Sequence, residues 1–403
     1  MLSLKHISQK LEGTVSLPYS KSIANRLLFL RMLQNKSIIF DITNLNNDIK
    51  LAQEATTAIA QNKCVYAEDA GTVFRFSLAL AASEPLFNNM IFANKRLMER
   101  PILPLIEILR SWGAEISIKP EGLLVKGIQF STQRLFLPPF ESSQFITALL
   151  LIAPKFGLSL SISPFQTSYA YINQTILLMQ TQGFDILQNN TSIAIKAKIP
   201  EIKVKNDAIE LDWSAASYFF SMAIISPVSK IFLNNLDFSK LQGDSIFIKN
   251  WIDMGIFSIE KSHGGIVILG SDIAQIPKVI DFSDCPDISM NFIFAMALKN
   301  LSFDALGLGT LNNKESKRLL ILHKALQKMG VNITSITENS ISISGCSIDA
   351  EPLIFNAYQD HRLAMTFAQY ALIGHCSIEQ TEAVNKSFPQ FWEQLSALNY
   401  EIT

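Results

Sequence analysis

The chain has 403 residues and a formal net charge of −1; 48% of the residues are hydrophobic and 17% are charged. This length exceeds what one ordinary hydrophobic core holds, so we expect two domains. The near-zero net charge argues against a general electrostatic attraction to nucleic acid or to a membrane surface.

The N-terminal segment, residues 1–15, lacks the continuous apolar run of a secretory signal and predicts a strand. Apolar stretches further along, such as residues 145–156, are too short to span a bilayer. No CxxC pair occurs among the four cysteines, which are Cys64, Cys285, Cys346 and Cys376. That spacing fits a reduced chain better than a disulfide framework or a zinc site. We therefore expect a soluble, cytoplasmic protein.

One pattern recurs along the chain: an amphipathic helix, a stop residue, and then the alternation typical of a strand. It occupies residues 101–118, 172–187, 246–259, 318–336 and 388–403. The stop residues are Gly113, Gly183, Gly255, Gly330 and Asn399, which recur about every 70 residues. Glycine suits this place because a helix often ends on a left-handed residue before the chain reverses. A sixth, degenerate copy is expected at residues 48–67.

Between these helices lie segments that predict a second kind of helix, rich in small residues and almost wholly apolar. They are residues 72–83, 142–154, 214–225, 287–298 and 361–372. A helix that is apolar on nearly every face is buried inside a domain. Six units, each with one buried and one amphipathic helix beside short strands, indicate two domains of three units. Several buried helices have polar starts, and helix N-termini gathered in one place form a natural anion site.

Short polar clusters interrupt the apolar scaffold, and together they combine cations with hydroxyls, an amide and a few carboxylates. In chain order they contain Lys21, Ser22, Arg26, Gly71, Thr72, Arg75, Arg100, Ser142, Ser143, Gln144, Ser168, Tyr171, Asp287, Lys314, Glu315, Arg318, Asp360, His361, Arg362 and Lys386. Such a mixture suits a ligand with phosphate and carboxylate groups, since arginine binds these anions bidentately. Taken singly, each cluster has an ordinary explanation. Ser142, Ser143 and Asp287 fit helix caps, Gly71 fits a turn, and a lone cation is usually a solvated surface charge.

The order and spacing of these clusters resemble the enolpyruvyl transferases, and among them the 5-enolpyruvylshikimate-3-phosphate synthase family. SKSIANR at residues 20–26 is similar to the family's SKSxxNR, DAGTVFR at 69–75 to NAGTxxR, and RLMERPI at 96–102 to RMxxRPI. Further similar segments follow in the family's order at residues 142–154, 168–179, 286–290, 314–319, 360–365 and 386–389. The resemblance extends from Ser16 to Leu398, and a collinear set is more specific than any single motif.

The resemblance implies an α/β fold with two similar domains, each made of three βαβαββ repeats with the helices packed inside, an inside-out α/β barrel. Domain I is expected to be discontinuous, at residues 1–19 and 211–403, with the phosphoenolpyruvate side and the acid/base residues. Domain II, at residues 20–210, is expected to form the shikimate 3-phosphate side. The family binds its ligands in the cleft between the domains.

The same resemblance implies transfer of the enolpyruvyl group of phosphoenolpyruvate to the 5-hydroxyl of shikimate 3-phosphate, with release of phosphate. This is a step of the shikimate pathway toward chorismate and the aromatic amino acids. It places Asp287 as the base and Glu315 as the proton donor, with Lys21 close to both ligands. A carboxyl that donates a proton near neutral pH needs a raised pKa. No metal or organic cofactor and no nucleic-acid or membrane partner is implied, and a monomer is expected.

The residues that the resemblance implies for substrate binding fall into two overlapping sets. Shikimate 3-phosphate is expected to contact Lys21, Ser22, Arg26, Ser142, Ser143, Ser168, Tyr171, Asp287 and Lys314. Phosphoenolpyruvate is expected to contact Lys21, Gly71, Arg100, Gln144, Arg318, Arg362 and Lys386. Gly71 is expected to matter by the absence of a side chain that would crowd the small ligand.

Four positions depart from the family pattern. Asp69 stands where the family has asparagine, which puts an acidic residue beside a site for anions. Phe76 stands at a position that is often proline, Thr310 at one that is usually asparagine, and Tyr19 at a common glycine. None of these is a residue expected to transfer protons.

Two alternative functions remain open on the sequence. The related transferase that acts on UDP-N-acetylglucosamine typically has an asparagine after its first lysine and a reactive cysteine in a loop. Here Ser22 follows Lys21, and residues 93–101 contain no cysteine. The other alternative is a non-catalytic relative that binds phosphorylated ligands, since fold alone does not establish activity. The joint presence of so many charged family residues argues against it.

Overall fold

The structure is a computed structural model. It describes residues 1–8, 10–35, 45–137, 142–163, 168–189, 191–201, 209–270, 273, 275–346 and 351–403. The chain divides into two compact units. Unit 1 comprises Met1–Ser20 and Glu210–Thr403, and unit 2 comprises Lys21–Ile209. The two pieces of unit 1 meet where Tyr19 and Leu211 form an antiparallel bridge.

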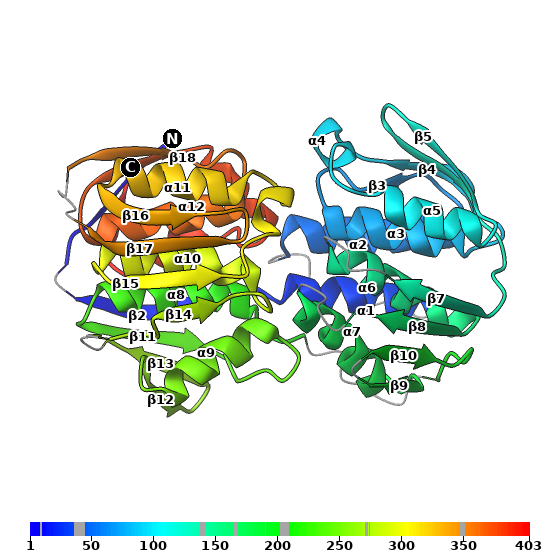
Figure 1. Ribbon diagram of the computed structural model, residues 1–403, viewed down its shortest axis with the longest axis horizontal. Helices are drawn as coiled ribbons and strands as arrows, with labels where there is room; N and C mark the ends of the chain where they lie inside the picture. The colour runs from blue at the N-terminus through cyan, green and yellow to red at the C-terminus, as the bar shows by residue number, and fades with distance from the viewer. Residues whose placement is uncertain are drawn as a thin grey trace. The chain divides into compact units, whose positions relative to one another are not determined.

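Unit 1 contains both ends of the chain and alternates strands with helices (Figure 1). Its strands are β1 (Leu2–His6), β2 (Leu11–Ser16), β11 (Ser229–Asn234), β12 (Ser258–Ser262), β13 (Gly265–Leu269), β14 (Val279–Asp281), β15 (Ser302–Leu306), β16 (Val331–Ile336), β17 (Ser340–Cys346), β18 (Leu353–Asn356), β19 (Cys376–Glu379) and β20 (Tyr400–Ile402). Its α-helices are α8 (Trp213–Ile225), α9 (Gly243–Asp253), α10 (Pro286–Leu298), α11 (Arg318–Lys328), α12 (His361–Phe367) and α13 (Phe391–Ser396). Short 3-10 turns are η3 (Leu311–Asn313), η4 (Ala368–Leu372) and η5 (Thr381–Lys386).

Unit 2 has the same alternation. Its strands are β3 (Val65–Tyr66), β4 (Asn88–Phe92), β5 (Glu115–Lys119), β6 (Gly122–Lys126), β7 (Gln133–Leu137), β8 (Leu158–Ile162), β9 (Ile186–Gln188) and β10 (Ser192–Ile195). Its helices are α1 (Lys21–Leu33), α2 (Asn47–Ala60), α3 (Gly71–Ala82), α4 (Lys95–Met98), α5 (Leu103–Ser111), α6 (Ser143–Ile152), η2 (Ala153–Lys155) and α7 (Tyr169–Thr181).

The sheets of the described residues share one topology. Each has four strands, of which the first two are parallel, while the fourth lies antiparallel between the second and the third. The orders are β2-β11-β13-β12, β14-β15-β17-β16 and β18-β19-β1-β20 in unit 1, and β3-β4-β6-β5 and β7-β8-β10-β9 in unit 2. In the third sheet β1 takes the fourth place, so the two chain ends complete one repeat. This is the predicted βαβαββ unit, and the predicted fold class is confirmed.

The stop residues of the repeat adopt the conformation that the sequence predicted for them. Their φ angles are 106° at Gly113, 86° at Gly183, 76° at Gly255, 78° at Gly330 and 67° at Asn399, and Asn62, for which no stop was predicted, has a φ of 50°. These values lie in the left-handed region, where glycine carries no steric penalty and asparagine a small one. The sixth, degenerate copy therefore ends its helix, α2, in the same way.

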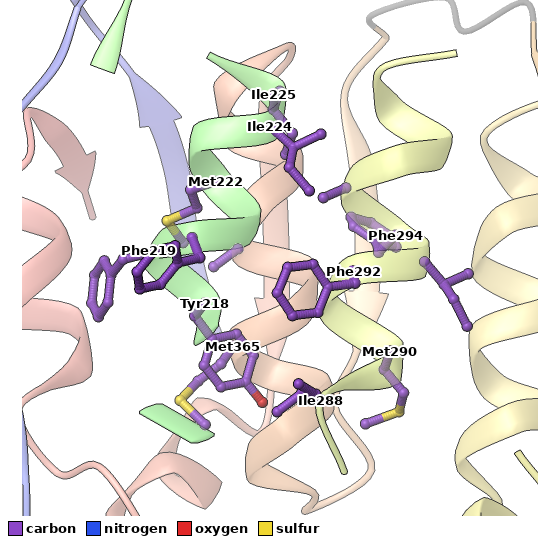
Figure 2. Close-up of a cluster of buried hydrophobic side chains, with 14 of the residues drawn as sticks. Tyr218, Phe219, Met222, Ile224, Ile225, Ile288, Met290, Phe292, Phe294 and Met365 are labelled. Carbon is purple, nitrogen blue, oxygen red and sulfur yellow. The ribbon is translucent and has the colours of Figure 1, made fainter. Parts of the chain in front are cut away.

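The apolar helices form the cores of the units. Figure 1 shows α8, α10 and α12 stacked side by side in unit 1, and α10 contacts both of the others. Side chains fill the space between α8 and α10, as Phe292 does in Figure 2. Every residue of α8 except Ser214, and every residue of α10 except Asp287, is buried. Both exceptions lie in the first turn of their helix, so the polar surface of this core is at the helix N-termini.

Unit 2 repeats this arrangement. All of α3 except Thr72 and all of α6 except Gln144 is buried, and both exceptions again lie in the first turn. Phe76, the departure from proline, is a core residue that packs edge-on against Phe29 at 5.5 Å between ring centroids. None of the helices in the described part of the chain combines the length and hydropathy that a membrane crossing requires.

Candidate active site

The first turns of three buried helices meet in unit 1. Arg362 of α12 donates from Nη1 to the backbone oxygen of Asp287 in α10 at 3.1 Å. Its Nη2 lies 3.4 Å from Asp287 Oδ2 and 3.4 Å from the hydroxyl of Ser214 in α8. The polar ends of α8, α10 and α12 are therefore joined through one guanidinium.

Asp287 is the centre of a cluster of cations. Its Oδ1 lies 3.3 Å from Lys314 Nζ and 3.2 Å from Arg318 Nη1, and its Oδ2 contacts Arg362. Burial raises the pKa of Asp287, but the charges of Lys314, Arg362 and Arg318 outweigh burial and hold this pKa well below its usual value. Asp287 is thus a carboxylate with three cationic partners.

Arg318 and Asp360 form a two-pronged ion pair that is almost fully buried. Arg318 Nε donates to Asp360 Oδ2 at 2.8 Å, and Nη2 donates to Oδ1 at 3.1 Å. The same carboxylate caps α12, since it accepts from the backbone N–H of Arg362 at 3.0 Å, and it also accepts from Ser316 at 2.8 Å. Burial raises the pKa of Asp360, and Arg318 outweighs this effect and lowers it. The pair joins the start of α11 to the start of α12.

The carboxylate of Glu315 contacts one histidine and one lysine. Its Oε2 lies 2.9 Å from His361 Nδ1, and its Oε1 lies 3.2 Å from Lys386 Nζ. Burial raises the pKa of Glu315, but His361 and Lys386 outweigh burial and hold the pKa well below its usual value. A proton donor at this position needs a raised pKa near neutral pH. In this structure the shift has the opposite direction, because the carboxylate is surrounded by positive charge.

Glu315, Asp360 and His361 bring three potential metal ligands within 4.8 Å of one another. Each carboxylate, however, already has a cation of the chain as its partner: Lys386 for Glu315 and Arg318 for Asp360. A divalent ion would have to displace both. The chemistry of this group therefore fits internal ion pairing better than a resident metal.

In unit 2, Arg75 connects three segments around the start of α3. Its Nη1 donates to the backbone oxygen of Gly71 at 3.0 Å and to Gln144 Oε1 at 3.1 Å, and Nη2 donates to the backbone oxygen of Pro101 at 2.7 Å. Gln144 in turn donates to the hydroxyl of Thr72 at 3.2 Å. Burial lowers the pKa of Arg75 to about 9, with a further lowering from Arg100. The structure thus brings the predicted residues Gly71, Arg100 and Gln144 together.

A second group of predicted residues lies at the start of α1. Lys21 Nζ is 3.0 Å from Asp48 Oδ2. Arg26 donates to the hydroxyl of Thr175 at 2.8 Å and to the backbone oxygens of Ser22 at 2.7 Å and Tyr171 at 3.2 Å. Burial lowers the pKa of Arg26 to about 10. Arg26 consequently ties α1 to α7, in addition to the binding role expected for it.

The serines of the predicted set have different surroundings. Ser142 caps α6 by accepting from the backbone N–H of Gln144 at 3.3 Å, the structural role that the sequence left open. Ser143 is buried, and Ser168 precedes α7 with a left-handed φ of 58°. Thr310 is buried, and its hydroxyl has no hydrogen-bond partner among the described residues.

Sequence reasoning left several residues of these clusters out of the predicted site. Arg75, Asp360 and His361 were visible as members of polar clusters at helix starts but were given no role. Ser214 and Asp244 were missed altogether. A single serine in an apolar helix and an aspartate after a glycine are too common to be distinctive, and the contact between them spans two helices.

Comparison with known proteins adds independent information. The model of the family described as EPSP synthase (3-phosphoshikimate 1-carboxyvinyltransferase) matches residues 36–395. The 3-phosphoshikimate 1-carboxyvinyltransferase of Bacteroides fragilis (strain YCH46) is 30% identical over 403 residues, covering 98% of this chain and 97% of that protein. The protein of that name from Thermococcus kodakarensis is 27% identical, covering 96% and 98%.

Two solved structures have the same fold. EPSP synthase from Acinetobacter baumannii superposes with a TM-score of 0.76 at 21% identity, covering 100% of this chain and 99% of that one. The enolpyruvyl transferase NikO from Streptomyces tendae gives a TM-score of 0.70 at 12% identity, covering 100% and 98%. With the family model matching most of the chain, these findings agree with the motifs at the helix starts. The chain therefore belongs to the EPSP synthase (3-phosphoshikimate 1-carboxyvinyltransferase) family.

Proposed function

We propose that this protein transfers the enolpyruvyl group of phosphoenolpyruvate to the 5-hydroxyl of shikimate 3-phosphate and releases phosphate. Family membership supports this reaction, a step of aromatic amino-acid biosynthesis. The observation that carries the proposal is the convergence in unit 1 of two carboxylates with four cations. These residues are Asp287, Glu315, Lys314, Arg318, Arg362 and Lys386.

Residues of both units are proposed to bind the substrates. For phosphoenolpyruvate they are Lys21, Gly71, Arg100, Gln144, Arg318, Arg362 and Lys386. For shikimate 3-phosphate they are Lys21, Ser22, Arg26, Ser142, Ser143, Ser168, Tyr171, Asp287 and Lys314. The cations in both sets match the phosphate and carboxylate groups of the ligands in charge and geometry.

The low pKa values of Asp287 and Glu315 belong to the state without substrate. An anionic ligand that binds Lys386 draws this cation away from Glu315, and the pKa of Glu315 then rises toward the range of a proton donor. In the same way, phosphate and carboxylate groups that bind Lys314, Arg318 and Arg362 leave Asp287 a stronger base. Ligand binding itself thus prepares both carboxylates for proton transfer.

The proposed chemistry has two steps. In the first, Asp287 accepts the proton of the 5-hydroxyl, the oxygen bonds to C2 of phosphoenolpyruvate, and C3 gains a proton from Glu315. In the second, the C2–O bond to phosphate breaks and C3 returns a proton to the Glu315 carboxylate, which restores the double bond. The departing phosphate takes the proton held by Asp287. Lys21, Arg318 and Lys386 stabilise the negative charge of the departing phosphate.

The family match does not favour the alternative substrate UDP-N-acetylglucosamine. We also propose that the protein acts as a cytoplasmic monomer. Among the side chains that the structure describes, Cys64, Cys285 and Cys376 are free thiols, in keeping with a reducing compartment. The following test distinguishes an active enzyme from a relative that only binds phosphorylated ligands.

The experiment measures phosphate release by the purified protein with both substrates, and with each substrate omitted. We expect release only when both are present, and a loss of about 10²- to 10⁴-fold in kcat for Asp287→Asn. The matched control Asp253→Asn removes only the exposed pair with Lys249 and should retain full activity. Folded wild-type protein that releases no phosphate would contradict the proposal, and release that Asp287→Asn leaves unchanged would contradict the role of this residue.

A further inference from the structure

The buried Asp244 and the partly exposed Ser214 form a pair beside Arg362 that none of the proposed steps uses. Asp244 lies in the first turn of α9 and is 5% exposed. Ser214, in the first turn of α8, donates its hydroxyl proton to Asp244 Oδ2. The same hydroxyl oxygen lies 3.4 Å from Arg362 Nη2. The three side chains thus form a continuous hydrogen-bonded chain across three helix starts.

The donor-to-acceptor order of these hydrogen bonds follows from the protons that each side chain carries. A guanidinium has only N–H donors, so the oxygen of Ser214 must accept from Arg362. Ser214 has one hydroxyl proton, and a carboxylate at Asp244 is the acceptor that turns this proton away from Arg362. The order is therefore Arg362 to Ser214 to Asp244, and an ionised Asp244 holds the serine with a lone pair facing the guanidinium.

Arg362 also contacts the side chain and backbone of Asp287. In the proposed reaction the carboxylate of Asp287 turns to the substrate hydroxyl, which weakens that side-chain contact. The contact with Ser214 makes no such change during catalysis. Together with the bond to the backbone oxygen of Asp287, it continues to orient Arg362 while phosphoenolpyruvate is bound.

We propose that Asp244 is a positioning residue that acts through Ser214 to aim Arg362 at the anionic groups of phosphoenolpyruvate. This inference rests on the proposed function, in which Arg362 binds that substrate. Asp244 itself touches neither substrate, and it affects binding more than the chemical step.

The surroundings of Asp244 add a dependence on pH. The groups that act on it are Ser214 and Asp212 from α8, Asp287 from α10, Arg362 from α12, and the buried thiol of Cys285. Burial raises the pKa of Asp244 to about 7, and Ser214 and Arg362 offset this only in part. Once protonated, Asp244 is a weaker acceptor for the Ser214 hydroxyl and can itself donate to that oxygen, so it holds the serine less firmly in the orientation that supports Arg362. The affinity for phosphoenolpyruvate should therefore fall as the pH decreases from 8 to 6.

The test compares Asp244→Asn and Ser214→Ala with two matched controls. Ser221→Ala removes another buried hydroxyl of α8, which bonds to Tyr218 and Asn291 and not to Arg362. Asp253→Asn makes the same chemical change at the exposed end of α9. We expect a five- to tenfold rise in the KM for phosphoenolpyruvate in both test variants, with kcat and the KM for shikimate 3-phosphate changed less than about twofold. The controls should match the wild type.

The pH profile separates positioning from general damage. Phosphoenolpyruvate itself titrates near pH 6, so wild-type KM contains its ionisation as well as that of Asp244. In Asp244→Asn only the substrate contribution should remain, and the change in KM between pH 6 and 8 should become smaller. An unchanged KM, an unaltered profile, or a parallel loss of kcat and both affinities would overturn the inference.

Calorimetric titration with phosphoenolpyruvate tests this inference independently of the proposed function, because it measures binding without turnover. Wild-type protein without turnover contradicts the proposed function, but weaker phosphoenolpyruvate binding by the two variants than by the wild type still supports the inference. Equal affinities contradict the inference alone. Wild-type protein that does not bind phosphoenolpyruvate contradicts both.

Discussion

At the scale of single residues, the structure gives a different physical reason for the expected importance of Gly71. The sequence suggested that a side chain there would crowd the small ligand. In the structure a Cβ on Gly71 would lie 2.8 Å from Nη1 of Arg100 and 2.8 Å from Nη1 of Arg75. A side chain would therefore displace guanidinium groups before it met any ligand.

For Gly71→Ala we expect a rise of about tenfold or more in the KM for phosphoenolpyruvate, with little change in Tm. Arg75 is fixed by three hydrogen bonds, so Arg100 is the group that should move. Steady-state kinetics measures the effect. In an Arg100→Ala background the additional cost of Gly71→Ala should largely disappear, because the displaced group is gone. An equal cost in both backgrounds would show that the alanine acts on the ligand directly.

At the scale of elements, Asp360 joins two helices with one carboxylate. It caps α12 and forms the buried two-pronged pair with Arg318 at the start of α11. Arg318 and Asp360 have only 3% and 0% of their side chains exposed. Removing one charge of such a pair leaves the other buried and uncompensated, which is more costly than the loss of the contact itself.

Asp360→Asn should lower the free energy of unfolding of unit 1 by about 3 kcal/mol, since asparagine still caps the helix but cannot balance Arg318. Urea unfolding followed by tryptophan fluorescence measures this. A Trp112→Phe background confines the signal to Trp213, Trp251 and Trp392, all in unit 1. Adding Arg318→Met should recover part of the loss. A cost no larger than that of the exposed Asp253→Asn would contradict the importance of the buried pair.

The elements were largely predictable from the sequence because each has a local cause. The stops at Gly113 and Gly330 and the all-apolar stretch of α10 are properties of a few neighbouring residues, and the structure has them where expected. The side-chain contacts between different elements were harder to predict from the sequence. The partner of Arg318 is Asp360, 42 positions away, and the pair depends on how two helix starts are packed. The resemblance identified most charged residues of the clusters, but not which of them pair in the absence of substrate.

At the scale of the whole molecule, the two units differ in their buried charges. Unit 1 holds the buried carboxylate Asp360 and the partly buried carboxylates Asp287 and Glu315, and neighbouring cations lower the pKa values of all three. Unit 2 buries Arg26 and Arg75, whose pKa values burial lowers to about 10 and about 9. Acid therefore changes the charge of the unit 1 groups and leaves the two arginines charged.

We expect acid to unfold unit 1 before unit 2. A carboxylate whose pKa is lower in the folded state stabilises that state above its unfolded pKa of about 4, and this contribution is lost as the pH falls through the folded pKa. Arg26 and Arg75 titrate only in alkali, where a lowered pKa makes stability rise with pH, so they contribute no acid transition. Hydrogen exchange followed by mass spectrometry from pH 7 to 2 resolves the units. Protection should disappear from α8, α10 and α12 at a higher pH than from α1, α3 and α6. Loss of protection in both sets of helices at one pH, or first in unit 2, would mean that the paired carboxylates do not set the acid stability of this protein.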